Sequence, residues 1–567
     1  MIGTYIAKWY NLWQWRNAGL QNILLAASLL PVPGTAIIRP VWLLPLAMLL
    51  WLYAIFMLPT NPFMKEMSIL NRPNILFLMC DQFRFDCIHA LGNQSIRTPN
   101  LDRLVARGVT CTNAYSACPV CVPARLTVRT GCESAHTGCY ENEAPVPMDG
   151  QDEMISGRCG KYLAQTLKEN GYRTFGVGKF HAHPDPYEDL GYENQQLTEE
   201  IMMKDDRSRD AFASFIDREH PEFSYLEQLH GERTEMYYMP QTSPLPASLT
   251  VESFVADRVI EQLRVQDQRP YFAFASFIGP HPPCAPPIPY NRMYNPDRME
   301  NPIRGNRGTD LMDEQLVYMN HAIWADEIND FQARVLKCRY YGEISYIDEQ
   351  IGRILDEVER RGDADNTLIC FFADHGDHLG DHHSWQKESY FEQSCHVPFL
   401  LSWPEKYAAG STFGGLISLT DLFGIATTAA GCQELRDGED ILGMLSGRIP
   451  EREAFVAVYG RPGTRRFKCM VRWGDYKYIY LANGGMEQLF QLKNDPHELK
   501  NLVEEGHEPA CSYLRQLAVE HLDRTGWQAA LETEGGEKRL KKFSLSYRPA
   551  TRIRQFGIEE NNFTDSL

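Results

Sequence analysis

The sequence predicts an α/β fold with a mainly parallel central sheet. Short apolar segments alternate with segments of helical periodicity along most of the 567 residues. This alternation is typical of a parallel sheet covered by helices on both faces. Polar side chains follow directly after several of the apolar segments. They therefore lie where such sheets bind ligands, beyond the carboxyl ends of the strands.

The first strand and the first helix have clear local signals. Residues 74–79 form an apolar run that ends in polar residues, as a buried parallel strand does. A helix is expected from Pro99 to Gly108, with Thr98 as a plausible N-cap. Proline is favoured at the first helical position, and glycine commonly ends a helix.

The same alternation continues through the next 300 or so residues. Further strands are predicted at residues 172–177, 271–278, 367–373 and 397–402. Helical patterns between them cover residues 160–171 and 344–361.

The pattern changes near residue 451 to short strands of antiparallel type. Such strands are predicted at residues 454–459, 467–473 and 476–481, with a turn at Gly474 and Asp475. The expected organisation is an apolar N-terminal segment (1–66), a main domain (72–450) with a polar insertion beside its cleft (182–250), a smaller antiparallel subdomain (451–538) and a polar tail (539–567).

Composition excludes some classes of function. The formal net charge of −18 argues against nucleic acid as a partner, because phosphate backbones require a basic surface. A small anionic substrate is still compatible, since a few local cations can outweigh the global charge inside a cleft. The 15 cysteines are an odd number without the spacing of a small disulfide scaffold. Free, buried thiols in a reducing or anaerobic setting are expected.

The N-terminal segment leaves two interpretations open. Residues 41–58 are an uncharged apolar run about long enough to span a bilayer, and no acidic residue precedes Glu66. One interpretation is a membrane anchor with contact through residues 41–58. The other is a leader that the native protein lacks, with Met64 or Met67 as the true start and a cytoplasmic location.

Two polar pairs at predicted strand ends suggest a metal site. Asp81 and Gln82 follow the first strand, and Asp374 and His375 follow the strand at residues 367–373. Oxygen ligands with one imidazole fit Ca²⁺, with Mg²⁺ or Mn²⁺ as alternatives, better than zinc. Each pair also has a simpler interpretation as a turn or cap. The loop after Asp374 contains further histidines, which suit a zinc site or a solvated loop: His378, His382 and His383.

The most specific motif begins at Cys121. Pro123 and Arg125 follow it, and Thr130-Gly131 closes the motif. A cysteine that only fills a core has no need of this arginine, whereas one that attacks an anionic ester does, because Arg offers a planar fork of donors to oxyanions. Cys118 and Cys121 also form a Cys-x-x-Cys pair, for which a redox or zinc role is the alternative.

These motifs, in this order along the chain, resemble those of the type I sulfatases of the alkaline phosphatase-like superfamily. The matching residues are Asp81, Gln82, Cys121, Arg125, Lys179, His181, His281, Asp374, His375 and Lys387. The resemblance covers roughly residues 72–505 and implies an α/β/α sandwich. Two positions depart from the family pattern. Cys132 replaces the Arg or Lys that usually follows Thr-Gly, and Ala124 replaces a frequent Ser.

The resemblance also implies a mechanism. A formylglycine-generating maturation enzyme would oxidise Cys121 to formylglycine, whose hydrate attacks the sulfur of a small sulfate ester at a divalent metal. The implied metal ligands are Asp81, Gln82, Cys121, Asp374 and His375. Arg125, Lys179 and Lys387 would neutralise the sulfate oxygens. His281 or His181 would supply a proton to the leaving alcohol or hold a hydroxyl.

Alternatives to this function come from two classes. A phosphonate or phosphate ester hydrolase on the same fold would use a similar metal set, although Lys179 and His181 favour sulfate monoesters. A non-catalytic, membrane-anchored binding protein would keep the fold without turnover. The resemblance to this family suggests a sulfated carbohydrate or an aryl sulfate as the substrate class.

Overall fold

The computed structural model describes residues 72–142, 155–182, 185–199, 207–226, 238–317 and 328–546. The predicted apolar run at residues 41–58 lies outside the described residues, as does most of the predicted tail. In the part of the chain that is described, no helix is both long and apolar enough to cross a membrane.

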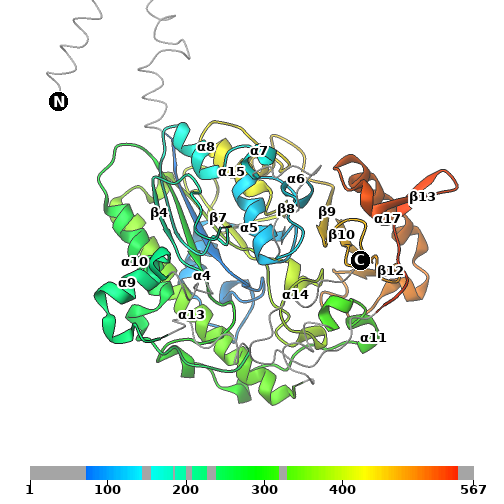
Figure 1. The fold of residues 1–567 in the computed structure, drawn as a ribbon, viewed down its shortest axis with the longest axis horizontal. Helices are drawn as coiled ribbons and strands as arrows, with labels where there is room; N and C mark the ends of the chain where they lie inside the picture. The colour runs from blue at the N-terminus through cyan, green and yellow to red at the C-terminus, as the bar shows by residue number, and fades with distance from the viewer. Residues whose placement is uncertain are drawn as a thin grey trace, which may run out of the picture. The chain divides into compact units, whose positions relative to one another are not determined.

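An eight-stranded sheet forms the centre of the fold (Figure 1). In order across the sheet, the strands are β4 (Asn194–Leu197), β3 (Arg173–Gly178), β5 (Tyr271–Phe277), β1 (Asn74–Cys80), β6 (Thr367–Ala373), β7 (Phe399–Ser402), β2 (Val109–Tyr115) and β8 (Ser411–Ser418). Strand β1 pairs in parallel with both β5 and β6, and β3 pairs in parallel with β5 and β4. The prediction of an α/β fold with a mainly parallel sheet is confirmed.

One strand runs against the others. Strand β7, expected at residues 397–402, is antiparallel to β6 and to β2. A parallel neighbour requires a crossover connection, usually a helix of several turns. Between β6 and β7 the chain has only a short 3₁₀ turn and the four-residue helix α14 (Glu392–Cys395), so it returns in the opposite direction.

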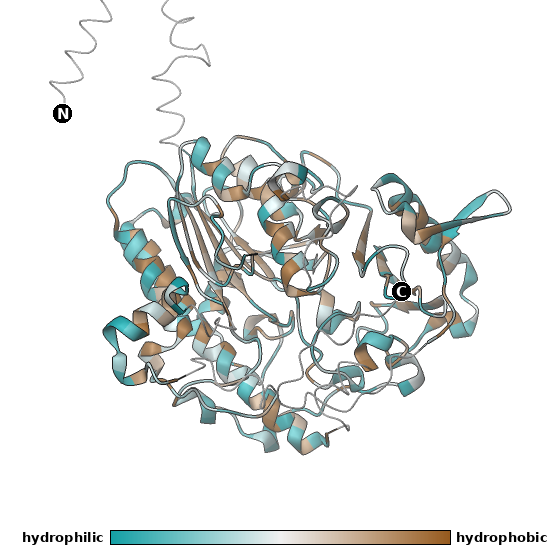
Figure 2. Ribbon diagram, in the orientation of Figure 1, coloured by the Kyte–Doolittle hydropathy of each residue, from teal (hydrophilic) through white to brown (hydrophobic). Residues whose placement is uncertain are grey.

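Helices cover both faces of the sheet (Figure 1). One layer contains α4 (Pro99–Arg107), α10 (Val251–Arg264) and α13 (Asp330–Arg361), and the other contains α5 (Cys121–Thr130), α8 (Leu163–Glu169) and α15 (Asp421–Ala429). From Ile75 to Cys80, strand β1 is at most 1% exposed, because both its faces are covered. Hydrophobic residues accordingly concentrate on the strands of the central sheet (Figure 2). The shorter helices are α6 (Ser134–Thr137), α7 (Ile155–Cys159), α9 (Ala211–Glu219), α11 (Arg307–Asp310) and α16 (Ile441–Leu445).

The predicted C-terminal antiparallel sheet is also present. Its strands, in spatial order, are β12 (Met486–Gln491), β11 (Tyr476–Leu481), β10 (Lys468–Trp473) and β9 (Ala454–Tyr459). Helix α17 (Glu508–Arg524) packs on this sheet, and the hairpin of β13 (Leu531–Glu534) and β14 (Glu537–Leu540) follows. Strands β10 and β11 are joined by the predicted turn at Gly474 and Asp475.

Helix α4 begins as predicted, but its N-terminus is capped by a distant residue. Thr98 occupies the N-cap position, yet its hydroxyl makes no capping hydrogen bond and donates to Asp102 Oδ1 at 3.1 Å. The carboxylate of Asp348, on α13, instead accepts from the backbone N–H groups of Asn100 (3.1 Å) and Leu101 (2.7 Å). A tertiary contact therefore replaces the local cap that the sequence suggests.

Residues 182–250, expected as a polar insertion, contain regular structure. Their described parts include β4, which forms one edge of the central sheet, and α9. Tyr238, also from this region, is 2% exposed and reaches the polar residues that follow β1. The segment thus supplies part of the main sheet as well as a contact with Gln82 at the end of β1.

Candidate active site

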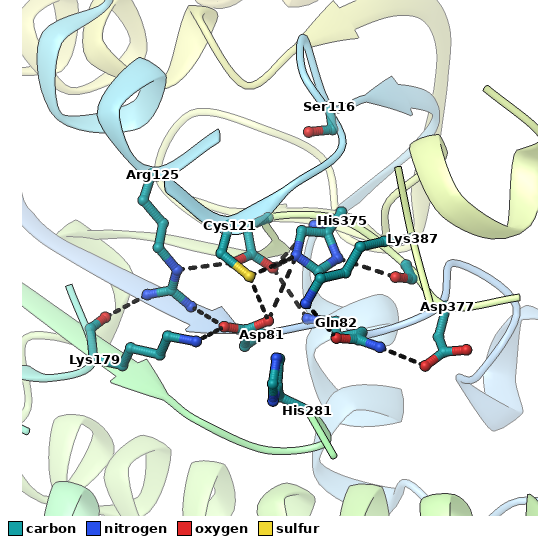
Figure 3. Close-up of polar contacts among 12 residues, drawn as sticks. Asp81, Gln82, Ser116, Cys121, Arg125, Lys179, His281, His375, Asp377 and Lys387 are labelled. Carbon is teal, nitrogen blue, oxygen red and sulfur yellow. Dashed lines mark hydrogen bonds and ion pairs between the residues drawn. The ribbon is translucent and has the colours of Figure 1, made fainter. Parts of the chain in front are cut away.

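The predicted site residues meet at one edge of the central sheet (Figure 3). Strands β1, β3, β5 and β6 are mutually parallel, so their carboxyl ends lie together. The residues that follow these ends, listed in strand order, are Asp81 and Gln82 after β1, Lys179 after β3, His281 after β5, and Asp374 and His375 after β6.

Cys121 lies at the centre of this group as the first residue of α5. Its Sγ atom is 3.2 Å from Nε2 of His375 and 3.8 Å from Oδ1 of Asp81. The side chain is 1% exposed. A helix N-terminus favours negative charge, so the position suits a nucleophile that reacts as an anion.

Four of the predicted metal ligands form one compact cluster. Potential ligand atoms of Asp81, Cys121, Asp374 and His375 all lie within 4.8 Å of one another, and all four residues are buried. Nδ1 of His375 lies 3.0 Å from the carbonyl oxygen of Gly376, to which it can donate, and this leaves Nε2 facing the cluster. Two carboxylates with one imidazole fit a divalent cation.

Gly376 allows this loop to pass close to another segment. A Cβ atom at this position would lie 2.0 Å from the backbone oxygen of Gln393. Only glycine fits such an approach without a shift of the backbone.

Both the nitrogen and the oxygen of the Gln82 side-chain amide are hydrogen-bonded. Its Nε2 donates to Asp377 Oδ2 and, at 3.1 Å, to the hydroxyl of Tyr238. Its Oε1 accepts from Nζ of Lys387 at 2.8 Å, and its backbone N–H donates to Asp374 Oδ1 at 3.0 Å. The amide orientation is therefore set, and the predicted site lysine Lys387 lies directly beside it.

Two buried cations balance the carboxylates. Arg125 donates from Nε to Asp374 Oδ2 at 2.8 Å and from Nη2 to Asp81 Oδ2 at 3.0 Å. Nζ of Lys179 contacts the same Asp81 Oδ2 at 2.5 Å. Burial alone would raise the pKa of Asp81, but Lys179, His281 and Arg125 outweigh it and hold that pKa well below its usual value. Each carboxylate thus binds cations through Oδ2, while its Oδ1 lies 3.6 Å (Asp81) or 3.7 Å (Asp374) from Nε2 of His375.

His281 lies beside Asp81 and points toward the cluster (Figure 3). Its Nδ1 is 2.7 Å from the carbonyl oxygen of Pro282, to which it can donate, so Nε2 is the atom available for proton transfer. The side chain is 3% exposed.

Lys179 and His181 lie two residues apart but do not share one side of a strand. Strand β3 ends at Gly178, and His181 has a left-handed backbone with φ of 50°. The carboxylate of Glu199 accepts the backbone N–H of His181 at 2.8 Å. Strand alternation therefore does not apply, and Lys179 reaches Asp81 without it.

A second arginine on the same helix, which is not among the predicted site residues, also contacts this segment. Arg129 is 3% exposed and donates from Nη1 to the backbone oxygen of Phe180, while Arg125 donates from Nη1 to the backbone oxygen of Lys179. The two arginines hold consecutive carbonyls of the segment that carries Lys179. Their i, i+4 spacing was a usable signal, since such residues share one helix face. The contacts of Asp377 and Tyr238 with Gln82 had no sequence signal.

Comparison with known proteins identifies the family. The Sulfatase family matches residues 73–432, which is more than half of the chain. The chain belongs to the sulfatase family. The family described as N-sulphoglucosamine sulphohydrolase, C-terminal, also matches residues 380–522. The protein is thus a sulfuric ester hydrolase with the alkaline phosphatase-like fold, and the predictions of family, fold and enzyme class are confirmed.

Two curated sulfatases and one solved structure of the same fold illustrate the similarity. An arylsulfatase of Clostridium perfringens is 28% identical over 480 residues, which cover 80% of this chain and 95% of the relative. A choline-sulfatase of Rhizobium meliloti is 28% identical over 491 residues, which cover 81% and 89%. The crystal structure of a phosphonate monoester hydrolase of Agrobacterium radiobacter has a TM-score of 0.68 at 26% identity and covers 83% of this sulfatase and 100% of that chain.

Proposed function

We propose that this sulfatase hydrolyses sulfate monoesters with a formylglycine made from Cys121 as its nucleophile. The observation that carries the proposal is the place of Cys121, which starts α5 with its Sγ 3.2 Å from His375 Nε2. No role as a core residue accounts for a thiol inside a cluster of carboxylates, imidazole and buried cations.

We infer that the site also holds one divalent cation, with Ca²⁺ preferred over Mg²⁺ or Mn²⁺. Its ligands would be Asp81, Gln82, Asp374, His375 and the side chain of residue 121. The oxygen-rich donor set supports Ca²⁺ over zinc. Together, the modified side chain and the cation would supply a nucleophile and a Lewis acid at neutral pH.

The residues of the chain itself would bind and orient the ester. Arg125, Lys179 and Lys387 place three positive charges around the carboxylates, and these charges would neutralise the oxygens of an arriving sulfate. All three side chains are at most 4% exposed, so their attraction for an anion is only weakly screened.

Proton transfer to the leaving alcohol is assigned to His281. Its Nδ1 contact with Pro282 fixes the ring and leaves Nε2 to donate. His181 stays an alternative donor, and Glu199 fixes its backbone by accepting its N–H.

The proposal implies two partners. One is a small sulfate ester, for which an aryl sulfate or a sulfated carbohydrate is the proposed class, supported by relatives named arylsulfatase and N-acetylglucosamine-6-O-sulfatase. The other is a maturation enzyme that oxidises Cys121, because a plain thiol cannot release sulfate in the last step. No nucleic acid partner is proposed, given the net charge of −18.

The test is a peptide mass combined with turnover. After co-expression with a formylglycine-generating enzyme, trypsin releases residues 108–125 as one peptide. We expect Cys121 in this peptide to have lost sulfur and two hydrogens and gained one oxygen. Cys121→Ala should lower kcat/KM for an aryl sulfate by more than about 10³-fold. An unmodified Cys121, with the maturation enzyme active on a control substrate, would refute the mechanism.

A phosphonate or phosphate ester hydrolase is the second candidate. It is favoured by the structural match to the phosphonate monoester hydrolase of Agrobacterium radiobacter. Parallel assays of the mature enzyme on an aryl sulfate, a phosphate diester and a phosphonate ester separate the two. A larger kcat/KM on the phosphonate ester would overturn the sulfate assignment and leave the formylglycine chemistry standing.

A further inference from the structure

Two of the cysteines contact each other away from the active site. All fifteen are free thiols in the structure, including Cys132 and Cys159. Cys132 Sγ lies 4.0 Å from the carbonyl oxygen of Cys159, and the two thiols are close enough to shift the pKa of each other. Cys132 directly follows Gly131, the C-cap of α5, and Cys159 is the last residue of α7. Helices α5, α6 and α7 lie side by side at this end of the molecule (Figure 1).

We propose that Cys132 and Cys159 form a redox-active dithiol, which a small-molecule disulfide converts into an intramolecular disulfide bond. The site is independent of the proposed ester hydrolysis, because neither thiol belongs to the cluster around Cys121.

One nearby cation favours a thiolate in this pair. Arg436 lowers the pKa of both Cys132 and Cys159, against burial and the carboxylate of Asp437. Arg436 is fixed there by its own contacts, since Nη2 donates to the backbone oxygen of Lys161 at 2.7 Å. Either thiol can therefore attack first, and the other then resolves the mixed disulfide.

The pair lies just below the protein surface. Cys132 is 5% exposed and Cys159 is 6% exposed, and the residues that follow Cys159, Gly160 and Lys161, are exposed. By contrast, Cys80 and Cys370 lie inside the central sheet with 0% exposure. A small reagent can approach the first pair after a local shift of a side chain, whereas the sheet cysteines require unfolding.

The exchange balances with a glutathione-type disulfide as the oxidant. The thiolate of one cysteine of the pair attacks one sulfur of the oxidised reagent, the reagent's S–S bond breaks, and one reagent thiolate leaves. The other cysteine then loses its proton to solvent and attacks the protein sulfur of the mixed disulfide, which releases the second reagent thiolate. Two protein thiols are oxidised, and one small disulfide is reduced to two thiols. Excess reduced reagent reverses both steps.

The bond would tie the end of the helix that begins with Cys121 to α7. It closes a loop between residues 132 and 159, which restricts the unfolded chain. For a loop of this length in a domain of this size, we expect the thermal midpoint of the oxidised protein to rise by about 3 °C over the reduced protein.

The test uses the full chain and oxidised glutathione as the probe. The folded protein is equilibrated with glutathione buffers of increasing oxidised fraction, alkylated under acid conditions and digested with trypsin. Cleavage after Arg129, Arg158 and Lys161 gives residues 130–158, which carry Cys132, and the tripeptide 159–161, which carries Cys159. We expect these two peptides to become cross-linked, with a loss of two hydrogens, and to separate again in excess reduced glutathione.

Matched variants identify the bond. Cys159→Ser should abolish the cross-link and the rise in thermal midpoint. Cys139→Ser, which changes the other cysteine of the 130–158 peptide, should retain both. Glutathione adducts without a cross-link, persistence of both free thiols in the most oxidising buffer, or a bond from Cys159 to Cys139 would each overturn the proposal.

Discussion

At the scale of single residues, Asp377 lies outside the cluster of potential metal ligands but fixes the orientation of the Gln82 amide. Asp377 accepts from Gln82 Nε2, from the Tyr238 hydroxyl and, through Oδ1, from the backbone N–H of Leu379. Because Asp377 only accepts, it holds the nitrogen of the amide and turns Oε1 toward Lys387. Side chains that hold a metal ligand in place, without contacting the metal, tune the affinity of a metal site.

Asp377→Asn tests this orientation. An asparagine has one donor and one acceptor face, so if its oxygen keeps Leu379, its NH₂ group opposes that of Gln82 and rotates the Gln82 amide. We expect the Ca²⁺ concentration for half-maximal activity to rise by about 10–100-fold, with a smaller change in kcat at saturating Ca²⁺. A titration of activity against Ca²⁺ after chelation measures both.

Tyr238→Phe is the matched control. It removes one of the contacts of Gln82 Nε2 and leaves Asp377 as its acceptor. The Ca²⁺ requirement should therefore change by less than about threefold. If Asp377→Asn and the unmodified protein needed the same Ca²⁺ concentration for half-maximal activity, Asp377 would not position Gln82.

At the scale of elements, helices α10 and α13 bring two buried carboxyl groups together. Glu252 on α10 and Glu343 on α13 both line a small cavity of about 30 Å³ next to His281. Glu252 accepts the backbone N–H of Gly279 at 3.3 Å. Burial raises the pKa of Glu252 to about 7, and burial together with Glu252 raises the pKa of Glu343 well above its usual value.

Glu252→Gln should therefore stabilise the protein in a pH-dependent way. The folded-state pKa of Glu252 is raised to about 7 from about 4.5, so the folded protein binds this proton more tightly, and stability falls as the pH rises through that window. At pH 8 we expect the variant to be more stable by about 1–3 kcal/mol, and at pH 5 the difference should nearly vanish. Urea denaturation at the two pH values measures it.

Glu261→Gln provides the control on the same helix. Glu261 is exposed and pairs with Arg258 at 2.9 Å, so its loss should cost less than about 1 kcal/mol at either pH. If Glu252→Gln changed the free energy of unfolding at pH 8 no more than Glu261→Gln does, Glu252 would not be the buried, proton-binding group described above.

The ends of elements also show where local signals stop. Pro99 and Gly108 mark the two ends of α4 as predicted. The fixed φ of proline suits the first helical position, whereas Gly108 is extended and allows a close approach, since a Cβ there would lie 2.5 Å from the backbone oxygen of Leu401. The cap itself comes from Asp348, which lies 247 residues after Leu101 in the chain. No local pattern indicates which distant carboxylate reaches a helix end.

At the scale of the whole molecule, a buried ion cluster connects the C-terminal sheet to the main sheet. Lys477 on β11 lies 2.9 Å from Glu392 Oε1 and 2.7 Å from Glu498 Oε1, and it is 0% exposed. Glu392 begins α14, a few residues after Lys387, and its Oε2 accepts from the Tyr115 hydroxyl at 3.3 Å. The docking of the C-terminal sheet therefore supports the segment that carries Lys387.

Lys477→Met tests this connection. The change leaves two buried carboxylates without their cation, and we expect it to destabilise the protein by about 3–5 kcal/mol. The midpoint of urea denaturation should fall accordingly, and activity should be lost at temperatures where the unmodified protein is stable.

Lys500→Met is the comparison at the surface. Lys500 is exposed and pairs with Glu505 at 2.9 Å, so its loss should cost at most about 1 kcal/mol. Equal effects of the two substitutions would mean that the Lys477 cluster adds nothing beyond a surface ion pair.

The sequence by itself determined the local features of this sulfatase. Periodicity and the chemistry of neighbouring residues were enough for four features. These are the strands that precede Asp81 and Asp374, the ends of α4, the strands of the C-terminal sheet and the motif around Cys121. The parallel strands also predicted that these polar residues meet, because their carboxyl ends share one edge of the sheet.

Only the tertiary structure decided the partners between distant segments. Four features had no local signal in the sequence. They are the direction of β7, the cap from Asp348, the contact of Tyr238 with Gln82 across 156 residues, and the contact of Cys132 with Cys159. Each depends on how separately formed elements pack, and many arrangements of distant segments are compatible with one local pattern. Burial and hydrogen bonding in the complete fold select among them.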